Sequence, residues 1–479
     1  MDLVPVIGLE VHVEVDTRSK LFCSCPVDPS AEPNTLICPQ CAGLPGAMPT
    51  LNREAIRLGV LAGLALNCRI NLESAFDRKH YFYPDLPKGY QLTQFFFPLC
   101  EGGVLHYLSE GEEKQLSITR IHVEEDAGKL THTPCGTGID LNRCGVPLLE
   151  IVTGPELHTP REAGDAFRVL REVLVFAGVT QGRMNLGHLR CDLNISLHRP
   201  GDPLGTRTET KNLNSFSGVE DAAAAEIRRQ TRILQQGGTI HQETMHFSQK
   251  TGETSPMRPK ETEADYRYFP EPDLPRLVLE KEWLTQLQQE LPELPYPRRL
   301  RYAAQGLKKE ESRLLSARRE WAEAFDRACG CCDCPPLLAK LFTGVVFTEQ
   351  AKGVSSVDDP IALPFPPERL GKIAQMQKDE SINAATAKSL CTQLFQGDFD
   401  PEEKCRRESM LLLTDPQELR RLAQATLSAE PSLTQEYRQG KIKVFPVLMG
   451  KAMAAGRGQA HPEKLKEALR VVLEENTLQ

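Results

Sequence analysis

Four cysteines near the amino-terminal end have the spacing of zinc ligands. Cys23 and Cys25 are separated by one residue, Cys38 and Cys41 by two, and twelve residues lie between the pairs. Two such pairs on short turns can complete a tetrahedral thiolate shell around Zn²⁺, which leaves no position open for catalysis. The sequence therefore predicts a structural zinc site, with four buried thiols as the alternative. The cysteine cluster at 329–334 has no second pair nearby, and no metal is expected there.

A second group of candidate residues is acidic. Glu10, His12 and Glu14 alternate along one stretch, and further acids lie at 124–126 and at Glu150 in other strand-like segments. Carboxylates with an imidazole suit a hard divalent cation such as Mg²⁺, especially where phosphate supplies the remaining oxygens. A solvated polar strand face would have the same pattern, so spacing alone leaves both interpretations open.

Basic residues form two further candidate surfaces. Alternation puts Arg207, Glu209 and Lys211 on one strand face, where they could balance phosphate or carboxylate charge or pair with neighbouring strands for stability alone. Cations mix with aromatic residues at 78–83 and 265–269, which is typical of nucleotide or RNA-end pockets and also of the edge of an aromatic core.

A basic region lies near the carboxyl end. Residues 438–466 carry seven Lys or Arg and one acid, in a chain whose net charge is −8. This concentration of charge indicates a phosphate-binding surface, with a solvated helix face as the alternative. The acidic balance of the whole chain argues against a protein that coats nucleic acid with its entire surface.

Period-2 patterns predict the strands that position the acidic residues. Residues 6–15 and 189–197 each place apolar side chains on one face and polar ones on the other. Thr159 and Glu162 form a capping box that predicts a helix ending at Gly178, and Ser217 is expected to open a second helix in the same way.

The chain divides by composition. Residues 1–292 are mixed α/β, a proline-rich segment follows at 290–297, and the remainder is helical, with a weaker boundary near 400. No apolar run reaches the length of a membrane span, and the start has no targeting pattern, so a cytoplasmic protein is expected. The sequence has no phosphate-binding loop of the GxxxxGK[ST] type and no Cys-His glutaminase pattern.

Several motifs together resemble the B subunit family of the bacterial aspartyl/glutamyl-tRNA amidotransferases. The resemblance is colinear through about residue 292, then sparse, and it reappears near Gly450. The matching blocks are 8–14 (GLEVHVE), 38–46 (CPQCAGLPG), 82–91 (FYPDLPKGYQ), 124–129 (EEDAGK), 142–150 (NRCGVPLLE), 189–192 (LRCD), 207–215 (RTETKNLNS) and 265–275 (DYRYFPEPDLP).

The resemblance implies an α/β cradle-like catalytic domain with a zinc-binding insertion at 1–292, a helical domain at 293–400 and a helical tRNA-binding tail at 401–479. It implies a glutamine-dependent ligase that phosphorylates the side-chain carboxylate of Glu-tRNA(Gln), Asp-tRNA(Asn) or both with ATP. Ammonia then displaces the phosphate. The implied partners form a heterotrimer with this chain: the A subunit is an amidase that supplies ammonia through a channel, and the small C subunit bridges the other two.

The resemblance also implies roles for individual residues. The implied Mg²⁺ ligands are Glu10, His12, Glu125 and Glu150, with Lys79, Arg190 and Asp192 as further catalytic residues. The implied substrate or ATP contacts are Arg207, Glu209, Lys211, Asn212, Tyr81, Asp265, Tyr266, Arg267 and Tyr268. The implied tRNA contacts are Lys441, Lys443, Lys451 and Arg457.

The sequence departs from the family pattern near the implied ammonia path. Asn185 and Leu186 stand where the family usually has two acids, and the helical domain matches weakly. Two other interpretations compete with this one: a tRNA-docking subunit that has lost its activity, and a zinc-dependent structural protein with a basic tail. The retained acidic residues argue against the first, and the polar strand faces argue against the second.

Overall fold

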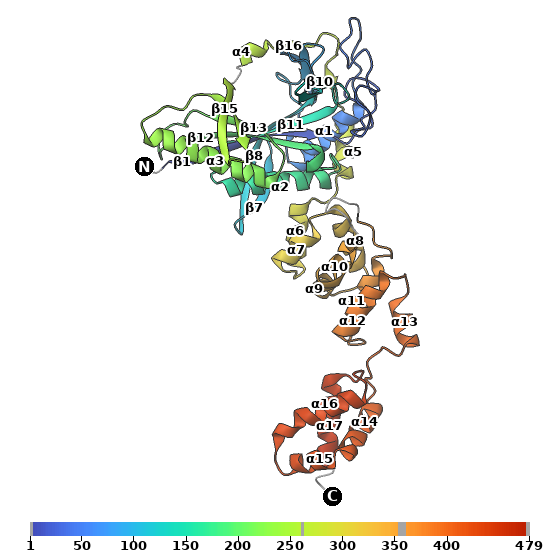
Figure 1. The fold of residues 1–479 in the computed structure, drawn as a ribbon. Coiled ribbons are helices and arrows are strands. Elements are labelled where there is room, and N and C mark those ends of the chain that lie inside the picture. Colours follow the sequence, from blue (N-terminus) through green and yellow to red (C-terminus); the bar gives the residue numbers. More distant parts are fainter. Residues whose placement is uncertain (1–2, 260–262, 353–360, 476–479) are drawn as a thin grey trace. The chain divides into compact units, whose positions relative to one another are not determined.

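A computed structural model describes residues 3–259, 263–352 and 361–475 (Figure 1). The chain forms two compact units, residues 1–298 and 299–479. The first is a mixed α/β unit and the second is helical throughout its described residues, as expected from the sequence. The division falls directly after the proline-rich segment. In the described part of the chain, no helix is both long and apolar enough to cross a membrane.

The first unit is built on a ten-stranded sheet with β1 at its centre. Every pairing is antiparallel except that of β13 with β14. In spatial order the strands are β15 (Glu253–Pro259), β14 (Glu243–Ser248), β13 (Thr208–Leu213), β12 (Leu189–His198), β1 (Val4–Glu14), β11 (Pro147–Thr153), β8 (Glu112–Glu125), β6 (Cys100–Glu101) and β2 (Arg69–Ile70), with β7 (Val104–Ser109) also paired to β8.

One face of this sheet is the core face. The β1 side chains of Ile7, Leu9, Val11 and Val13 are fully buried, which confirms the alternation expected for this strand. Three helices cover the apolar surface: α1 (Arg53–Ala65) packs on β8, α2 (Pro160–Phe176) packs on β7, and α3 (Phe216–Gln235) packs on α2 and β12 (Figure 1). The other face of the central strands is left for polar side chains.

The helix starts show one correct and one wrong prediction. Thr159 caps α2, and its backbone and side chain exchange hydrogen bonds with Glu162 in the expected capping box. Helix α3, however, is capped by Ser215 instead of Ser217. The Ser215 backbone is extended and its hydroxyl accepts from the Gly218 N–H at 3.0 Å, so Ser217 already lies in the first turn.

Smaller elements surround the open face of the sheet. A three-stranded sheet joins β4 (Asp77–His80), β5 (Tyr90–Thr93) and β16 (Phe269–Pro270). It brings together the two cation-rich aromatic segments, which are almost two hundred residues apart in the sequence. The remaining elements of this unit are β3 (Glu73–Ser74) with β17 (Leu277–Val278), the hairpin β9 (Lys129–Thr133) and β10 (Gly136–Asp140), η1 (Met184–Leu186), α4 (Glu263–Tyr266) and α5 (Lys281–Glu290).

The second unit contains two separate apolar cores. The first gathers Tyr302, Phe325 and Phe342, and the second gathers Leu419, Leu448 and other residues up to Leu473. The helices of this part of the chain are α6 (Pro295–Ala304), α7 (Lys309–Leu315), α8 (Arg319–Cys329), α9 (Pro335–Leu341), η2 (Phe342–Val346), α10 (Phe347–Ala351), α11 (Glu368–Lys378), α12 (Ala384–Leu394), α13 (Pro401–Arg407), α14 (Pro416–Ala429), α15 (Pro431–Arg438), η3 (Ile442–Val444), α16 (Phe445–Ala455) and α17 (Pro462–Glu475).

Candidate active site

The register of four neighbouring strands builds a polar row across the open face of the sheet. His12 of β1 stands opposite Glu150 of β11 on one side and Arg190 of β12 on the other. Glu150 in turn stands opposite His122 of β8. Since directly opposite residues have Cβ atoms about 5 Å apart, one carboxylate lies between two imidazoles.

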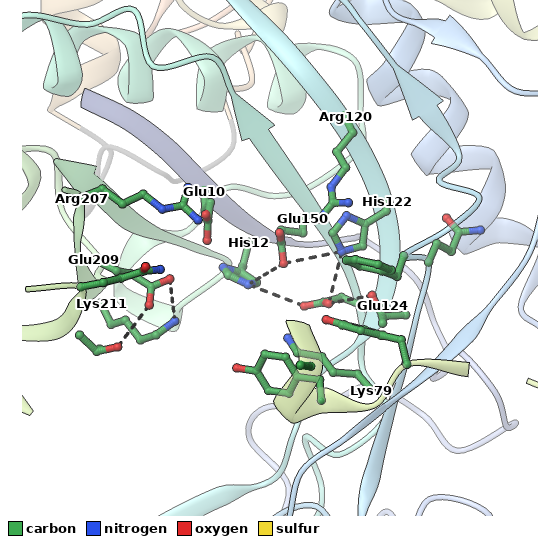
Figure 2. Close-up of a pocket in the computed structure, with 18 residues that line it drawn as sticks. Glu10, His12, Lys79, Arg120, His122, Glu124, Glu150, Arg207, Glu209 and Lys211 are labelled. Atoms are coloured by element: carbon green, nitrogen blue, oxygen red, sulfur yellow. Dashed lines mark hydrogen bonds and ion pairs between the residues drawn. The ribbon is translucent and has the colours of Figure 1, made fainter. Parts of the chain in front are cut away.

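Glu124 joins this row from β8 and completes a four-residue cluster. The His12 Nε2 lies 3.5 Å from Glu150 Oε2 and 3.7 Å from Glu124 Oε1. The His122 Nε2 lies 3.6 Å from the Oε2 atoms of both glutamates (Figure 2). These distances exceed those of hydrogen bonds. His12, Glu124 and Glu150 each offer a ligand atom within 4.8 Å of the others, so the three can bind one metal ion.

Charge coupling within the cluster is strong. Burial lowers the pKa of His12, but the polar contact and negative charge of Glu150, followed by the charge of Glu124, outweigh it and raise the pKa to about 9. Burial raises the pKa of Glu150, but His122 and His12 outweigh it and hold that pKa well below its usual value. Burial raises the pKa of Glu124, but its contact with His122 outweighs this and lowers that pKa. Both carboxylates are therefore ionised at neutral pH, as metal ligands must be, whereas His12 must release its proton to bind a cation.

The structure does not bring Glu125 to this cluster. Glu125 follows Glu124 on β8 and therefore points to the opposite side of the strand. Its carboxylate accepts hydrogen bonds from the Lys88 ammonium and, at 2.9 Å, from the Leu92 N–H. Both members of the Lys88–Glu125 pair are buried. The expectation that Glu125 stands beside His12 is therefore wrong, and Glu124 occupies that place.

A second acidic group lies beside the first. Glu10, Asp192 and Glu209 have ligand atoms within 4.8 Å of one another. The Lys211 ammonium lies 3.1 Å from Asp192 and 3.2 Å from Glu209, so a cation already bridges two of the three carboxylates. Burial lowers the pKa of Lys211, but these two charges outweigh it and raise the pKa. The Asn212 N–H also donates to Asp192, at 2.8 Å.

Both acidic groups border one cavity of about 660 Å³, which all their members except Asp192 line. Arg120, Arg207, Lys79 and Lys211 project into it beside the carboxylates (Figure 2). A cavity lined by several cations and by ionised carboxylates can accept a polyphosphate together with a metal ion.

A smaller cavity of about 180 Å³ adjoins the first and shares His12, Glu124 and Lys211 with it. Arg190 and Asn212 line it, and the Arg190 guanidinium donates to Asp126 at 2.9 Å. The catalytic residues expected from the sequence at 79, 190 and 192 thus all lie on these two adjoining cavities, and Glu125 does not.

Aromatic rings form a continuous run that begins outside the two cavities at Tyr83 and continues along their walls. Tyr83 contacts Tyr81, Tyr81 contacts Tyr266, and Tyr266 contacts Tyr268, with ring centroids 5.9 to 6.3 Å apart. Tyr268 then stacks on Phe95 at 4.1 Å. The Lys79 ammonium lies 4.8 Å from the Tyr266 ring centroid.

Asp265 and Arg267, two further expected substrate contacts, are more exposed than the tyrosines beside them. Asp265 and Arg267 are exposed, and neither is among the residues that line the two cavities. The Arg267 backbone carbonyl accepts from the His80 ring, at 3.1 Å. Their side chains therefore lie outside the cavity wall that Tyr266 and Tyr268 form.

The four cysteines of the amino-terminal segment come together. Their Sγ atoms all lie within 4.8 Å of one another, as a shared metal ion requires. The fully buried Lys20 ammonium donates to the carbonyl oxygens of Leu36 and Leu141 and braces the segment. A hydrogen bond from the Cys23 thiol lowers the pKa of Cys41. The cluster at 329–334 is not among the metal-competent groups of the described residues.

The basic residues expected to contact tRNA lie in the second unit. Lys441 forms an ion pair with Glu436 at 3.3 Å, and Lys451 forms one with Glu430 at 2.8 Å. Lys443 lies in η3, and Arg457 adopts a left-handed backbone conformation directly after α16.

Several residues of the site do not follow from the sequence patterns above. His122 and Arg120 are not among the expected residues, although their alternation with Glu124 on β8 places all three on one face and could have identified them. Gln94 and Thr244 also line the larger cavity, and only the folded chain brings them there.

Comparisons with known proteins identify the family of this chain. A family model described as the GatB/GatE catalytic domain matches residues 5–285, and one described as the GatB domain matches 323–473. The B subunit of the aspartyl/glutamyl-tRNA(Asn/Gln) amidotransferase of Geobacter sulfurreducens is 41% identical over 98% of this chain and 99% of that protein. The protein of the same name from Thermus thermophilus is 41% identical over 97% and 98%. The chain therefore belongs to the family of aspartyl/glutamyl-tRNA(Asn/Gln) amidotransferase B subunits.

Proposed function

We propose that this chain activates the side-chain carboxylate of Glu-tRNA(Gln), Asp-tRNA(Asn) or both with ATP and exchanges it for an amide. The carboxylate oxygen attacks the γ-phosphorus of ATP and ADP leaves, after which ammonia attacks the acyl carbon and phosphate leaves. The names of the relatives support this assignment. The observation that carries it is the cluster of His12, Glu124 and Glu150 on the wall of a cation-lined cavity.

The cluster fits Mg²⁺. Two ionised carboxylates and one imidazole within 4.8 Å supply hard ligands, and a side of the cluster faces the cavity, where phosphate oxygens could complete the shell. Bound there, Mg²⁺ would neutralise triphosphate charge. The second acidic group could hold a further cation if Lys211 moved away from Asp192 and Glu209.

The surrounding residues would position the substrates. Arg120, Arg207 and Lys79 lie where they could bind the phosphates, and fixing the line of attack is the main task in phosphoryl transfer. Arg190 and Asn212, on the smaller cavity, would then orient the acyl group.

Tyr81, Tyr266 and Tyr268 offer ring surfaces for a nucleobase of ATP or of the RNA end. Asp265 and Arg267 are exposed beside them and would contact the RNA backbone or ribose from outside. In this proposal the first unit acts as a cradle, because the sheet face and the aromatic segment would enclose the aminoacyl end.

The remaining parts of the chain have supporting roles in this proposal. Cys23, Cys25, Cys38 and Cys41 would hold a structural Zn²⁺. The helical tail at 401–479 would bind tRNA through Lys441, Lys443, Lys451 and Arg457. An amidase and a small third subunit would complete a heterotrimer, because no glutaminase motif is found in this sequence.

The test is phosphate release from ATP by the chain assembled with its amidase and its small partner. Turnover should require Glu-tRNA(Gln) or Asp-tRNA(Asn) and should not occur with uncharged tRNA. Glu150→Gln should abolish it, whereas His132→Gln, on the exposed hairpin, should not. Tight binding of charged tRNA without ATP turnover in the unmodified complex would instead establish a docking subunit.

A further inference from the structure

His122 lies beside the metal-competent group of His12, Glu124 and Glu150 and is not among the residues expected from the sequence. Only 4% of its side chain is exposed, whereas 21% of the His12 side chain is exposed. Both imidazoles line the larger cavity, but His12 is the more exposed of the two. A cation that also binds phosphate needs free coordination positions toward the cavity, and the position beside His12 offers more of them.

The carboxylate oxygens are divided between the two imidazoles. Glu124 turns Oε1 toward His12 and Oε2 toward His122. Glu150 places Oε2 between both rings, 3.5 Å from His12 and 3.6 Å from His122. Fixing the Oε2 side of Glu124 therefore leaves its Oε1 directed at the position beside His12.

The second ring nitrogen of His122 indicates which role it has. Its Nδ1 is buried and has no hydrogen-bond partner among the described residues. An imidazole that binds a metal almost always donates its other N–H to an acceptor, and a buried N–H without an acceptor is costly. The proton of His122 is therefore placed on Nε2, the nitrogen that faces the two carboxylates.

We propose that His122 is a positioning residue of the metal site and not a metal ligand. It directs its Nε2–H at the carboxylates that bind the cation and so orients them toward His12. This inference rests on the proposed metal site at His12, Glu124 and Glu150. Residues that hold the ligands of a metal in this way typically contribute 10- to 100-fold to its affinity.

Mn²⁺ binding to the full-length chain, followed by electron paramagnetic resonance, tests the proposal without turnover. His122→Leu should weaken Mn²⁺ binding about 10- to 100-fold. His122→Gln retains an N–H donor at similar reach and should restore most of the affinity. His132→Gln serves as the matched control, because it changes an exposed histidine of the same chain.

The nitrogen of a histidine bound to Mn²⁺ modulates the electron paramagnetic resonance signal of the ion, so this modulation identifies the coordinated histidine. The modulation should persist in His122→Gln and disappear in His12→Gln. A second Mn²⁺ at Glu10, Asp192 and Glu209 would give no such signal, because that group contains no histidine.

Other results of these measurements would overturn either the role of His122 or the metal site itself. Loss of the modulation in His122→Gln but not in His12→Gln would make His122 the ligand and overturn the proposal, as would unchanged affinity in His122→Leu. Absence of Mn²⁺ binding in the unmodified chain would instead overturn the proposed metal site itself. Melting temperatures of the variants separate misfolding from loss of metal, and His122→Gln provides the test if His122→Leu does not fold.

Discussion

Two consecutive glutamates of β8 have opposite environments. Glu124 faces His12 and His122 across the polar cavity, and Glu125 lies on the other side of the strand against Lys88 and the Leu92 backbone. The pair differs only in which side of the strand each residue occupies. One carboxylate is therefore available to a cation, and the other neutralises a buried ammonium.

The different surroundings of Glu124 and Glu125 predict that replacing each by glutamine changes a different property, turnover in one case and stability in the other. Glu124→Gln should lower tRNA-dependent phosphate release about 100-fold or more, because a bound cation contributes several kcal/mol to phosphoryl transfer. Glu125→Gln should instead lower the free energy of unfolding by about 3–5 kcal/mol, since it leaves the Lys88 ammonium buried without its partner. Urea unfolding and phosphate release, measured on both variants, check this.

A second substitution at Lys88 tests the predicted stability loss of Glu125→Gln more directly. Lys88→Met combined with Glu125→Gln removes the unpaired charge and should recover much of the lost stability. Equal losses of turnover in Glu124→Gln and Glu125→Gln, with unchanged stability in both, would contradict the assignment of the two residues.

A histidine beside the end of β1 predicts a pH effect on stability. Burial, followed by the charge of Arg183, lowers the pKa of His188 below its usual value of 6.5. The folded chain therefore takes up a proton at His188 less readily than the unfolded chain. The stability that neutral His188 supports is complete above about pH 6.5 and is lost as the pH falls below it.

Urea midpoints at pH 7.5 and pH 5.5 measure this effect. The midpoint of the unmodified chain should fall on acidification, and His188→Gln should remove part of that fall. A His198→Gln variant, at a more accessible position, serves as the control. If His188→Gln and the unmodified chain lose stability equally, His188 does not contribute.

At the scale of elements, the segment that contains the four clustered cysteines has little regular structure of its own. Residues 15–52, all within the described part of the chain, contain no helix or extended strand, and Lys20 and the four cysteines hold the segment together. Its backbone hydrogen bonds belong to turns and to scattered contacts with other segments and not to a helix or sheet, so a bound metal ion would add to its stability.

Metal analysis and thermal unfolding check this expectation. The purified chain should contain one Zn²⁺, and Cys41→Ser should lose it and lower the melting temperature. A chelator should have the same effect on the unmodified chain and none on Cys41→Ser. Cys334→Ser serves as the control, because no zinc is expected at the 329–334 cluster. Zinc retained in Cys41→Ser would contradict the four-cysteine site.

The elements that could be predicted from sequence are those fixed by local patterns. The alternation of β1 and β12 and the capping box of α2 are properties of short segments, and the structure confirms them. The cap of α3 is Ser215 and not Ser217 because the choice between two nearby serines depends on where β13 ends. The joining of β4 with β16 could not be predicted, since it pairs segments without a local signal.

The same distinction applies to the site. Alternation on β1 predicts that Glu10 and His12 share one face, and alternation on β8 favours Glu124 over Glu125. The Lys88 pairing and the position of His122 opposite Glu150 depend on the register of distant strands, which the sequence of one strand does not specify.

On the scale of the whole molecule, charge is unevenly distributed. The net charge is −8, whereas residues 438–466 of the second unit are strongly basic. Two of the expected tRNA contacts there, Lys441 and Lys451, already pair with glutamates at the surface. Exposed pairs of this kind are weak, so phosphate can replace the carboxylate at small cost.

The tail predicts a salt-dependent contribution to tRNA binding. Replacing Lys441, Lys443, Lys451 and Arg457 by alanine should weaken tRNA binding and reduce the slope of log affinity against log salt by roughly 0.7–0.9 for each phosphate that the tail no longer neutralises. The affinity for ATP should not change. Binding isotherms at several salt concentrations measure the slope, and an unchanged slope would exclude these residues from the tRNA interface.

The central position of β1 has a consequence for how the protein is made. The ribosome makes β1 before its two neighbours, β11 and β12, which lie at 147–153 and 189–198. β1 therefore waits for well over a hundred residues with both of its edges unpaired and its apolar side chains unburied. Such a strand invites wrong pairing. Folding of the first unit should consequently be late during translation and dependent on chaperones that bind the nascent β1 segment.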